Sequence, residues 1–253
     1  MLKNKRVLVT RPAHQSDEFA AGLLALGAVP VLAPTIEIAP PDDPAAAEQA
    51  AYRAREFAWI VFTSANGVRV FFDLLDARRE DARALGDSKI AAIGIKTSQA
   101  LRRRGIYADL VPQTYVAEDL AEALIAASKT GDAMLIFRAQ EARDVLPERL
   151  RERDRHPHVV AAYKTVYTDD PQLAERARSC DILAFTSAST VRGFAHNLGG
   201  NEGAAQAASG KTVACIGPIT AQEARSIGLR VDAIANEYTA DGLLRALERL
   251  TSA

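Results

Sequence analysis

Short apolar runs alternate with stretches of helical spacing along the whole chain. Each run is followed by hydroxyl or glycine residues, as Trp59–Phe62 is followed by Thr63 and Ser64. Between the runs, apolar residues recur at intervals of three and four, which is the spacing of one helix face. Strands that alternate with helices favour parallel sheets with helices on both faces, so the pattern predicts an α/β fold of the doubly wound kind.

The pattern assigns most elements to definite residues. Strands are predicted at residues 7–10, 29–32, 36–39, 59–62, 89–93, 108–111, 162–168 and 182–185. Helices are predicted at residues 14–26, 45–57, 66–75, 94–104 and 118–127. Gly105 follows the fourth of these helices, at the position where a left-handed backbone commonly ends a helix.

The sequence contains a long internal repeat. Phe62-Thr63-Ser64-Ala65 returns as Phe185-Thr186-Ser187-Ala188, 123 positions later. Eight further identities at the same offset follow without a gap, beginning with Gly94 and Gly217. We interpret this agreement as an internal duplication.

The opening part of the chain repeats at a different offset of 127, which pairs Arg11 with Arg138. An Asp-Pro pair ends each copy, as Asp43-Pro44 and Asp170-Pro171, just after a predicted strand. Proline interrupts regular structure, so these pairs mark linkers at equivalent places. Two linkers, one in each repeat, predict two domains between which the chain crosses twice.

The composition is that of a globular protein, with 48% hydrophobic and 25% charged residues. A net charge of −1 argues against a globally basic nucleic-acid binder. No apolar run approaches the roughly 20 residues of a membrane span, and the first residues enter a strand pattern too soon for a signal peptide. Cys180 and Cys215 adjoin predicted strands, as buried reduced thiols do. We therefore expect a cytoplasmic protein.

The candidate binding residues lie in loops after the predicted strands, because parallel sheets bind ligands at the carboxyl ends of their strands. These loops are rich in hydroxyls, small residues and cations and contain no carboxylate, which suits a ligand with several negative charges. A simpler explanation is that the serines and threonines cap helices. The loop residues are Arg11, Thr63, Ser64, Asn66, Gly94, Lys96, Thr97, Arg138, Thr186, Ser187, Ser189, Gly217 and Thr220.

Other chemistries lack their motifs. The chain has no GxGxxG or GxxxxGK[ST] loop and no Gly-x-Ser-x-Gly elbow, and its four histidines are scattered, so we expect no metal site. Tyr163 and Tyr167 have the same parity in a strand just before the second linker, so both should point to one face. Tyr163 is then either a functional group in a cleft between the domains or a ring packed at their junction.

Several motifs stand in order along the chain: Val7–Pro12, Phe62–Gly67, Ile93-Gly94, Tyr163-x-Thr165 and Ile216-Gly217-Pro218-x-Thr220. Together they resemble the uroporphyrinogen-III synthase family. The resemblance covers residues 7–250, and it implies two α/β domains joined by a two-stranded linker. Domain 1 would combine residues 1–38 and 168–253, and domain 2 would comprise residues 39–167, with the active-site cleft between them.

The resemblance implies an enzyme that cyclises hydroxymethylbilane, a linear tetrapyrrole with many carboxylates, to uroporphyrinogen III. The last ring is inverted and water is lost, through an azafulvene and a spiro intermediate, without a metal or organic cofactor. Tyr163 matches the cleft tyrosine of the family and would help the hydroxyl leave. The implied substrate-binding residues are the loop residues above, without Ser189 and with Pro218. The resemblance also points to a transient handover from the preceding pathway enzyme.

Two other classes of protein stay open. A non-catalytic two-domain protein that closes on a small polyanion would explain the loops, and the chain shows no obvious acid–base pair. A nucleotide-dependent enzyme is a third hypothesis, although the usual phosphate-binding loops are missing.

Overall fold

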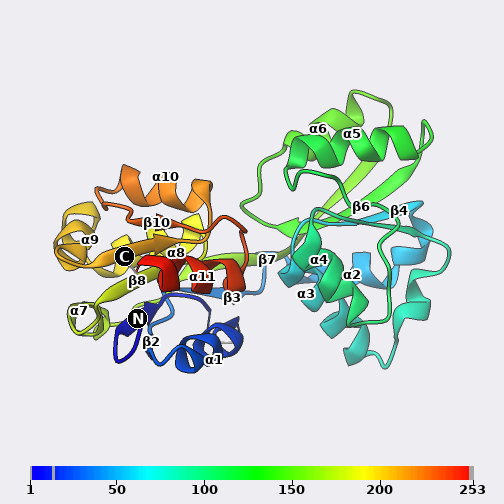
Figure 1. The fold of residues 1–253 in the computed structure, drawn as a ribbon. Coiled ribbons are helices and arrows are strands. Elements are labelled where there is room, and N and C mark those ends of the chain that lie inside the picture. Colours follow the sequence, from blue (N-terminus) through cyan, green and yellow to red (C-terminus); the bar gives the residue numbers. More distant parts are fainter. Residues whose placement is uncertain (1, 13–14, 251–253) are drawn as a thin grey trace. The chain divides into compact units, whose positions relative to one another are not determined.

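The computed structural model describes residues 2–12 and 15–250. The chain divides into two compact units, of which unit 1 comprises residues 1–38 and 166–253 and unit 2 comprises residues 39–165. Each unit contains one five-stranded sheet (Figure 1), and each is described here by itself. The predicted α/β class with two parallel sheets is confirmed.

The sheet of unit 1 has the strand order β10-β9-β8-β1-β2, and all of its neighbours are parallel. Its strands are β1 (Arg6–Val9), β2 (Val29–Leu32), β8 (Ile182–Phe185), β9 (Thr212–Cys215) and β10 (Ala233–Ile234). Its helices are α1 (Asp17–Ala25), α7 (Leu173–Arg178), α8 (Ala188–Asn197), α9 (Asn201–Ala208), α10 (Pro218–Ser226) and α11 (Ala240–Leu250).

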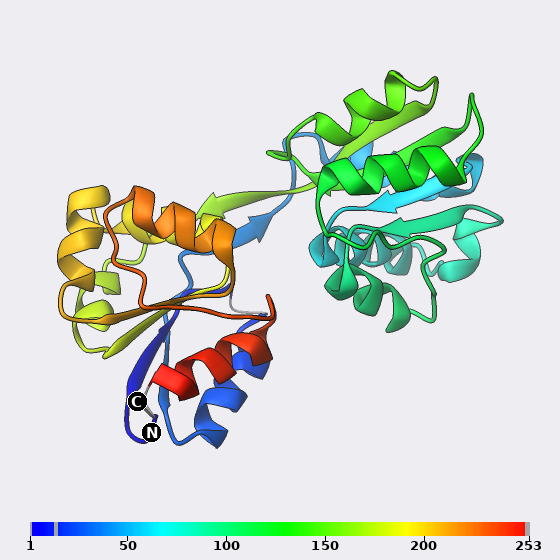
Figure 2. The ribbon, with the colours of Figure 1, turned by 45° about the horizontal axis from the view of Figure 1, so that its top comes forward.

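Helices cover both faces of this sheet because alternate residues of each strand point to opposite sides. In β8, Ile182 packs in a core with Phe19 of α1, whereas Phe185 packs in a second core with Phe194 of α8. Figure 2 shows α1 beside α11 on one side of the sheet. The central strand β8 is thus buried on both faces, which explains why all four of its residues are apolar.

The sheet of unit 2 has the order β3-β7-β6-β4-β5, and β4 pairs in parallel with both β5 and β6. The strands of this sheet are β3 (Ile36–Ala39), β4 (Trp59–Phe62), β5 (Lys89–Ala92), β6 (Ala133–Ala139) and β7 (His156–Tyr167). Residues 36–38 of β3 and 166–167 of β7 are assigned to unit 1. Its helical segments are α2 (Pro44–Tyr52), η2 (Ala54–Glu56), α3 (Ala65–Ala77), η3 (Ala82–Leu85), α4 (Ile95–Arg102), α5 (Ala117–Ala127) and α6 (Val145–Arg151). The duplication stays an interpretation of the sequence, although β5-β4-β6-β7 has the same order as β9-β8-β1-β2.

Several predicted elements differ from the structure. The strand predicted at residues 108–111 is a single bridge between Leu110 and Ala91, and the helix predicted at 45–57 breaks after Tyr52 into the 3₁₀ turn η2. The strand predicted at 162–168 begins at His156, because residues 156–158 pair with residues 133–135 of β6. The helix predicted from His14 has its N-cap at Ser16 and begins at Asp17, and His14 itself lies outside the described residues.

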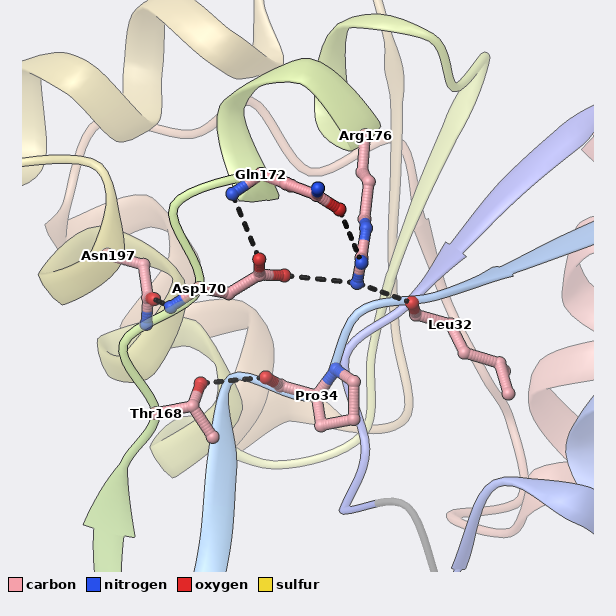
Figure 3. A network of polar contacts seen from close by, with 7 residues as sticks. All are labelled: Leu32, Pro34, Thr168, Asp170, Gln172, Arg176 and Asn197. Atoms are coloured by element: carbon pink, nitrogen blue, oxygen red, sulfur yellow. Dashed lines mark hydrogen bonds and ion pairs between the residues drawn. The ribbon is translucent and has the colours of Figure 1, made fainter.

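The aspartates of both proline-marked linkers accept hydrogen bonds close to the start of a helix, but only Asp43 is an N-cap, since α7 has its N-cap at Gln172. Asp43 caps α2 by accepting from the Ala46 N–H at 3.1 Å. Asp170 accepts from the Gln172 N–H at 2.9 Å and from Arg176 at 3.1 Å, and Arg176 also donates to the Leu32 carbonyl (Figure 3). This network fastens the segment after β7 to the end of β2 within unit 1.

Candidate active site

The loop after β4 presents a serine at the start of α3. Ser64 has an extended backbone, with φ −161° and ψ 155°, and its Oγ accepts from the Gly67 N–H at 3.0 Å. The simpler explanation for this serine, that it caps its helix, is therefore borne out, while its role in binding an anion stays a prediction. Because β4 lies between β5 and β6 in parallel, the loops after all three strands meet at one edge of the sheet.

Tyr163 reaches this edge from β7. Its hydroxyl donates to Ser64 Oγ at 2.9 Å, and its side chain is 6% exposed. The register of β7 against β6 shifts after Arg138, so that Ala139 pairs with Tyr163 rather than with Ala162. Such an irregularity re-aims a side chain, and here it accompanies the turn of the phenol toward Ser64.

The tyrosine is a hydrogen-bond donor in its neutral form. Burial raises the pKa of the Tyr163 phenol above its ordinary value of 10.0, while hydrogen bonds with Ser64 and Asn66 oppose the shift. A phenol with a raised pKa keeps its proton through the neutral pH range. Tyr163 can therefore donate a hydrogen bond, but it is poorly suited to act as a base.

The corresponding loop of unit 1 follows β8. Ser187 has the same extended backbone, with φ −164° and ψ 160°, and its Oγ accepts from the Thr190 N–H at 3.1 Å. The Thr190 hydroxyl oxygen in turn accepts from the Ser187 N–H, which completes a capping box. The Ser187 hydroxyl also shares a 2.8 Å hydrogen bond with Ser189. The hydrogen bonds of Ser187 are thus made with residues of the first turn of its own helix, α8.

The starts of α4 and α10 form a second matched pair. Gly94 and Gly217 are their N-caps, and neither helix has a side-chain cap. A Cβ at Gly94 would lie 3.0 Å from the Tyr115 ring, and one at Gly217 would lie 3.2 Å from the Tyr238 ring. Glycine at both N-caps therefore lets a half-exposed tyrosine ring pack closely against the start of each helix. Tyr115 and Tyr238 are themselves 123 positions apart, which is the offset of the internal repeat, so the repeat was the sequence signal for this matched packing.

The two strand-end arginines occupy different environments. Arg138 is 8% exposed and donates to the Arg143 carbonyl at 2.7 Å and to the Asp144 carboxylate at 2.5 Å. Its guanidinium thus serves the turn between β6 and α6. Arg11 is half-buried, and its Nε is buried without a hydrogen-bond partner in the described part of the chain. Burial lowers the pKa of the Arg11 guanidinium.

The predicted site residues fall into two groups, one in each unit. Unit 2 holds Thr63, Ser64, Asn66, Gly94, Lys96, Thr97, Arg138 and Tyr163, and unit 1 holds Arg11, Thr186, Ser187, Gly217, Pro218 and Thr220. Thr97 and Thr220 are each 4% exposed, so ligand contact there falls to the backbone around them. Lys96 and Pro218 are exposed. A cleft between the two domains stays a prediction.

No group of three or more metal-ligating side chains occurs within residues 2–12 and 15–250. Cys180 and Cys215 are buried and free, and burial raises the pKa of Cys215 to about 12. Among the same described residues, no helix is long and apolar enough to cross a membrane.

Each unit is an α/β domain built on a mainly parallel sheet. At the carboxyl edge of each sheet, one helix is capped by serine and another by glycine. These features define an α/β protein with two similar domains and a hydroxyl-rich candidate site. The family model described as uroporphyrinogen-III synthase HemD matches residues 17–245. A uroporphyrinogen-III synthase of Synechococcus elongatus is 34% identical, over 98% of this chain and 96% of that protein. The chain belongs to the uroporphyrinogen-III synthase family.

Two further relatives fit this assignment. The porphyrin biosynthesis protein HemD of Ruminiclostridium josui is 31% identical over 96% of this chain, which spans 48% of that protein. A mutant uroporphyrinogen III synthase from the extremely thermophilic bacterium Thermus thermophilus has a similar fold, with a TM-score of 0.68 and 19% identity over 98% of this chain and 100% of that one.

Proposed function

We infer that the protein cyclises hydroxymethylbilane to uroporphyrinogen III, with inversion of the last pyrrole ring and loss of water, in tetrapyrrole biosynthesis. The observation that carries this conclusion is the family match, which extends through both units, from residue 17 to residue 245. A non-catalytic polyanion-binding protein is not favoured, because the similar full-length relative is named as the enzyme.

The geometry of the loops suits this reaction. The substrate carries acetate and propionate arms, and helix starts, hydroxyls and cations bind carboxylates. Arg11 supports this role because the buried Nε of its half-buried side chain has no partner among the described residues and would gain one from an incoming anion. The proposed binding residues are Arg11, Thr63, Ser64, Asn66, Gly94, Lys96, Thr97, Arg138, Thr186, Ser187, Gly217, Pro218 and Thr220. Arg138 is the weakest of these, since its guanidinium already holds Asp144.

The reaction demands more of substrate shape than of acid–base strength. Once the terminal hydroxyl leaves, the azafulvene must meet the ring that it attacks, and holding reacting groups together can lower a barrier by roughly 7–11 kcal/mol. The neutral Tyr163, which is hydrogen-bonded to Ser64, is the group proposed to assist loss of the terminal hydroxyl. In this proposal the protein acts mainly by holding the substrate in a ring-closing conformation, and Tyr163 assists the loss of the hydroxyl.

The test supplies freshly made hydroxymethylbilane to the purified protein and resolves the uroporphyrinogen isomers. We expect the type III isomer at a rate well above the uncatalysed closure. Type I isomer alone, at the uncatalysed rate, would overturn the proposed function. Nucleotide binding detected by calorimetry would instead favour the nucleotide-dependent alternative.

The partners and location follow from the same proposal. The net charge of −1 and the two buried free thiols support a cytoplasmic protein that binds neither nucleic acid nor membrane. Because the substrate closes by itself to the wrong isomer, we expect a transient handover from the enzyme that makes it. Coupled assays of the two enzymes should then give less type I isomer than the same substrate released into bulk solution.

A further inference from the structure

The phenol of Tyr163 is not available for direct contact with a ligand. Its side chain is 6% exposed, and its hydroxyl proton is used in the 2.9 Å bond to Ser64 Oγ. A direct contact between this phenol and a leaving hydroxyl would break that bond and uncover a buried ring. The group that lies beyond the phenol in the hydrogen-bond chain is Ser64.

The hydroxyl of Ser64 can still donate one hydrogen bond. A hydroxyl oxygen offers two acceptor sites and one proton, and here the oxygen accepts from Tyr163 and from the Gly67 N–H. Within residues 2–12 and 15–250 its own proton has no acceptor, so this proton remains to be donated. Ser64 is only half-buried at the carboxyl edge of the sheet, whereas Tyr163 is buried. A ligand at this edge can therefore reach Ser64 but not Tyr163.

The chain behind Ser64 strengthens that donor. Asn66 hydrogen-bonds Tyr163 through its side chain, and Tyr163 donates to Ser64. Successive hydrogen bonds polarise one another, so a hydroxyl that accepts two bonds becomes a better donor. The Gly67 N–H belongs to the first turn of α3, whose partial positive charge acts in the same direction.

We propose that Ser64 is the residue that contacts the leaving hydroxyl of the substrate, and that Tyr163 acts through Ser64 as a positioning and polarising residue. This inference rests on the proposed function. In the step, the C–O bond breaks with both electrons on oxygen, and Ser64 gives its proton to form water. In concert, Ser64 regains a proton from Tyr163 and Tyr163 regains one from a solvent water. The hydroxide so formed takes the proton that the terminal pyrrole nitrogen releases as the azafulvene forms, so the substrate loses one water overall.

The serine of unit 1 lacks this arrangement. Ser187 also caps its helix, but its Oγ is bonded to Ser189 and lies within 3.5 Å of the Thr190 hydroxyl. Thr35, on the segment of unit 1 that follows β2, donates to the Thr190 carbonyl rather than to the serine. The proposed relay is therefore specific to the Ser64 loop.

The test measures kcat and KM for Ser64→Gly, Ser64→Thr, Tyr163→Phe and the double variant Ser64→Gly/Tyr163→Phe. Glycine is tolerated at an N-cap, so Ser64→Gly removes the hydroxyl with little loss of stability. We expect Ser64→Gly to lower kcat about 100-fold, in the range of a lost general acid, with KM changed less than about threefold. The threonine variant should recover most of the turnover. Tyr163→Phe should cost about tenfold alone and add less than about twofold to Ser64→Gly.

The control variant is Asp81→Ala, which removes the cap of the 3₁₀ segment η3 just before β5, at the opposite edge of the sheet from the Ser64 loop. Its unfolding midpoint should fall at least as far as that of Ser64→Gly, while its kcat stays near that of the parent. A Ser64→Gly protein with parental kcat, or a double variant whose loss is the product of the two single losses, would overturn the relay. In both cases a parent that still makes the type III isomer would leave the proposed function standing.

Discussion

The loops after β4 and β8 begin with the same residues, yet their serines have different partners. Ser64 accepts from a helix amide and from a buried tyrosine, whereas Ser187 is tied into a capping box and to Ser189. The backbone conformations are nearly the same, so the difference comes from what the rest of each unit places beside the serine. Repeated loops can therefore share a capping role while only one of them acquires a chemical role.

The largest expected effect is on stability, and it comes from a difference between α8 and α3. Helix α8 packs closely against the segment that contains Thr35. A Cβ at Gly193 of α8 would lie 2.3 Å from the Thr35 carbonyl oxygen, whereas α3 has the half-buried Val70 at the equivalent position. Gly193→Val should therefore force the backbone of unit 1 to move and lower its unfolding free energy by about 3 kcal/mol.

Urea unfolding can assign this loss to one unit. The chain has one tryptophan, Trp59, which is buried in unit 2. For Gly193→Val, circular dichroism should show an earlier transition, while the Trp59 fluorescence midpoint stays close to that of the parent. A variant whose circular dichroism midpoint equals that of the parent would contradict the close packing of α8.

Substitutions of the two strand-end arginines should have different effects, on stability at Arg138 and on substrate binding at Arg11. Arg138→Met removes the bonds to Asp144 and to the Arg143 carbonyl, and it should destabilise unit 2 by about 1–2 kcal/mol, a range reduced because Asp144 is 63% exposed. Arg11→Met should instead raise KM about tenfold, equal to about 1.4 kcal/mol of binding. Trp59 fluorescence and steady-state kinetics would measure the two losses. Equal KM for Arg11→Met and the parent would remove Arg11 from the binding site.

The smallest expected effect is a pH dependence. Burial raises the folded-state pKa of Tyr163 above 10.0, with Glu141 adding to the shift and Arg69 opposing it. The stability that comes from the neutral phenol is fully present below the unfolded-state pKa and is lost as pH rises toward the folded-state value. Between pH 10 and 11 the parent should therefore lose more stability than Tyr163→Phe, by at most about 1.4 kcal/mol. Parallel losses in the two proteins would contradict the buried, neutral phenol.

The sequence predicted the parts of the fold that depend on local pattern. Trp59–Phe62 and Ile182–Phe185 are strands with the predicted bounds, because short apolar runs between turn residues leave little choice. Gly105 has a φ of +80°, as expected for a glycine that ends a helix. The capping serines could also be predicted, since serine is common at the start of a helix.

The sequence could not predict the features that depend on tertiary contacts. The register shift that turns Tyr163 toward Ser64 arises from the pairing of β7 with β6. The same holds for Arg138, whose partner Asp144 lies across a turn, and for the early start of β7. Local propensity carries no information about a partner strand, so the arrangement of the site had to come from the structure.

The central claim is that the Ser64 loop carries chemistry while the Ser187 loop contributes to binding. The most direct test compares Ser64→Gly with Ser187→Gly in the isomer-resolved assay with fresh hydroxymethylbilane. We expect kcat to fall about 100-fold for Ser64→Gly, whereas Ser187→Gly should raise KM by a larger factor than it lowers kcat. Equal losses of kcat in the two variants would contradict the claim.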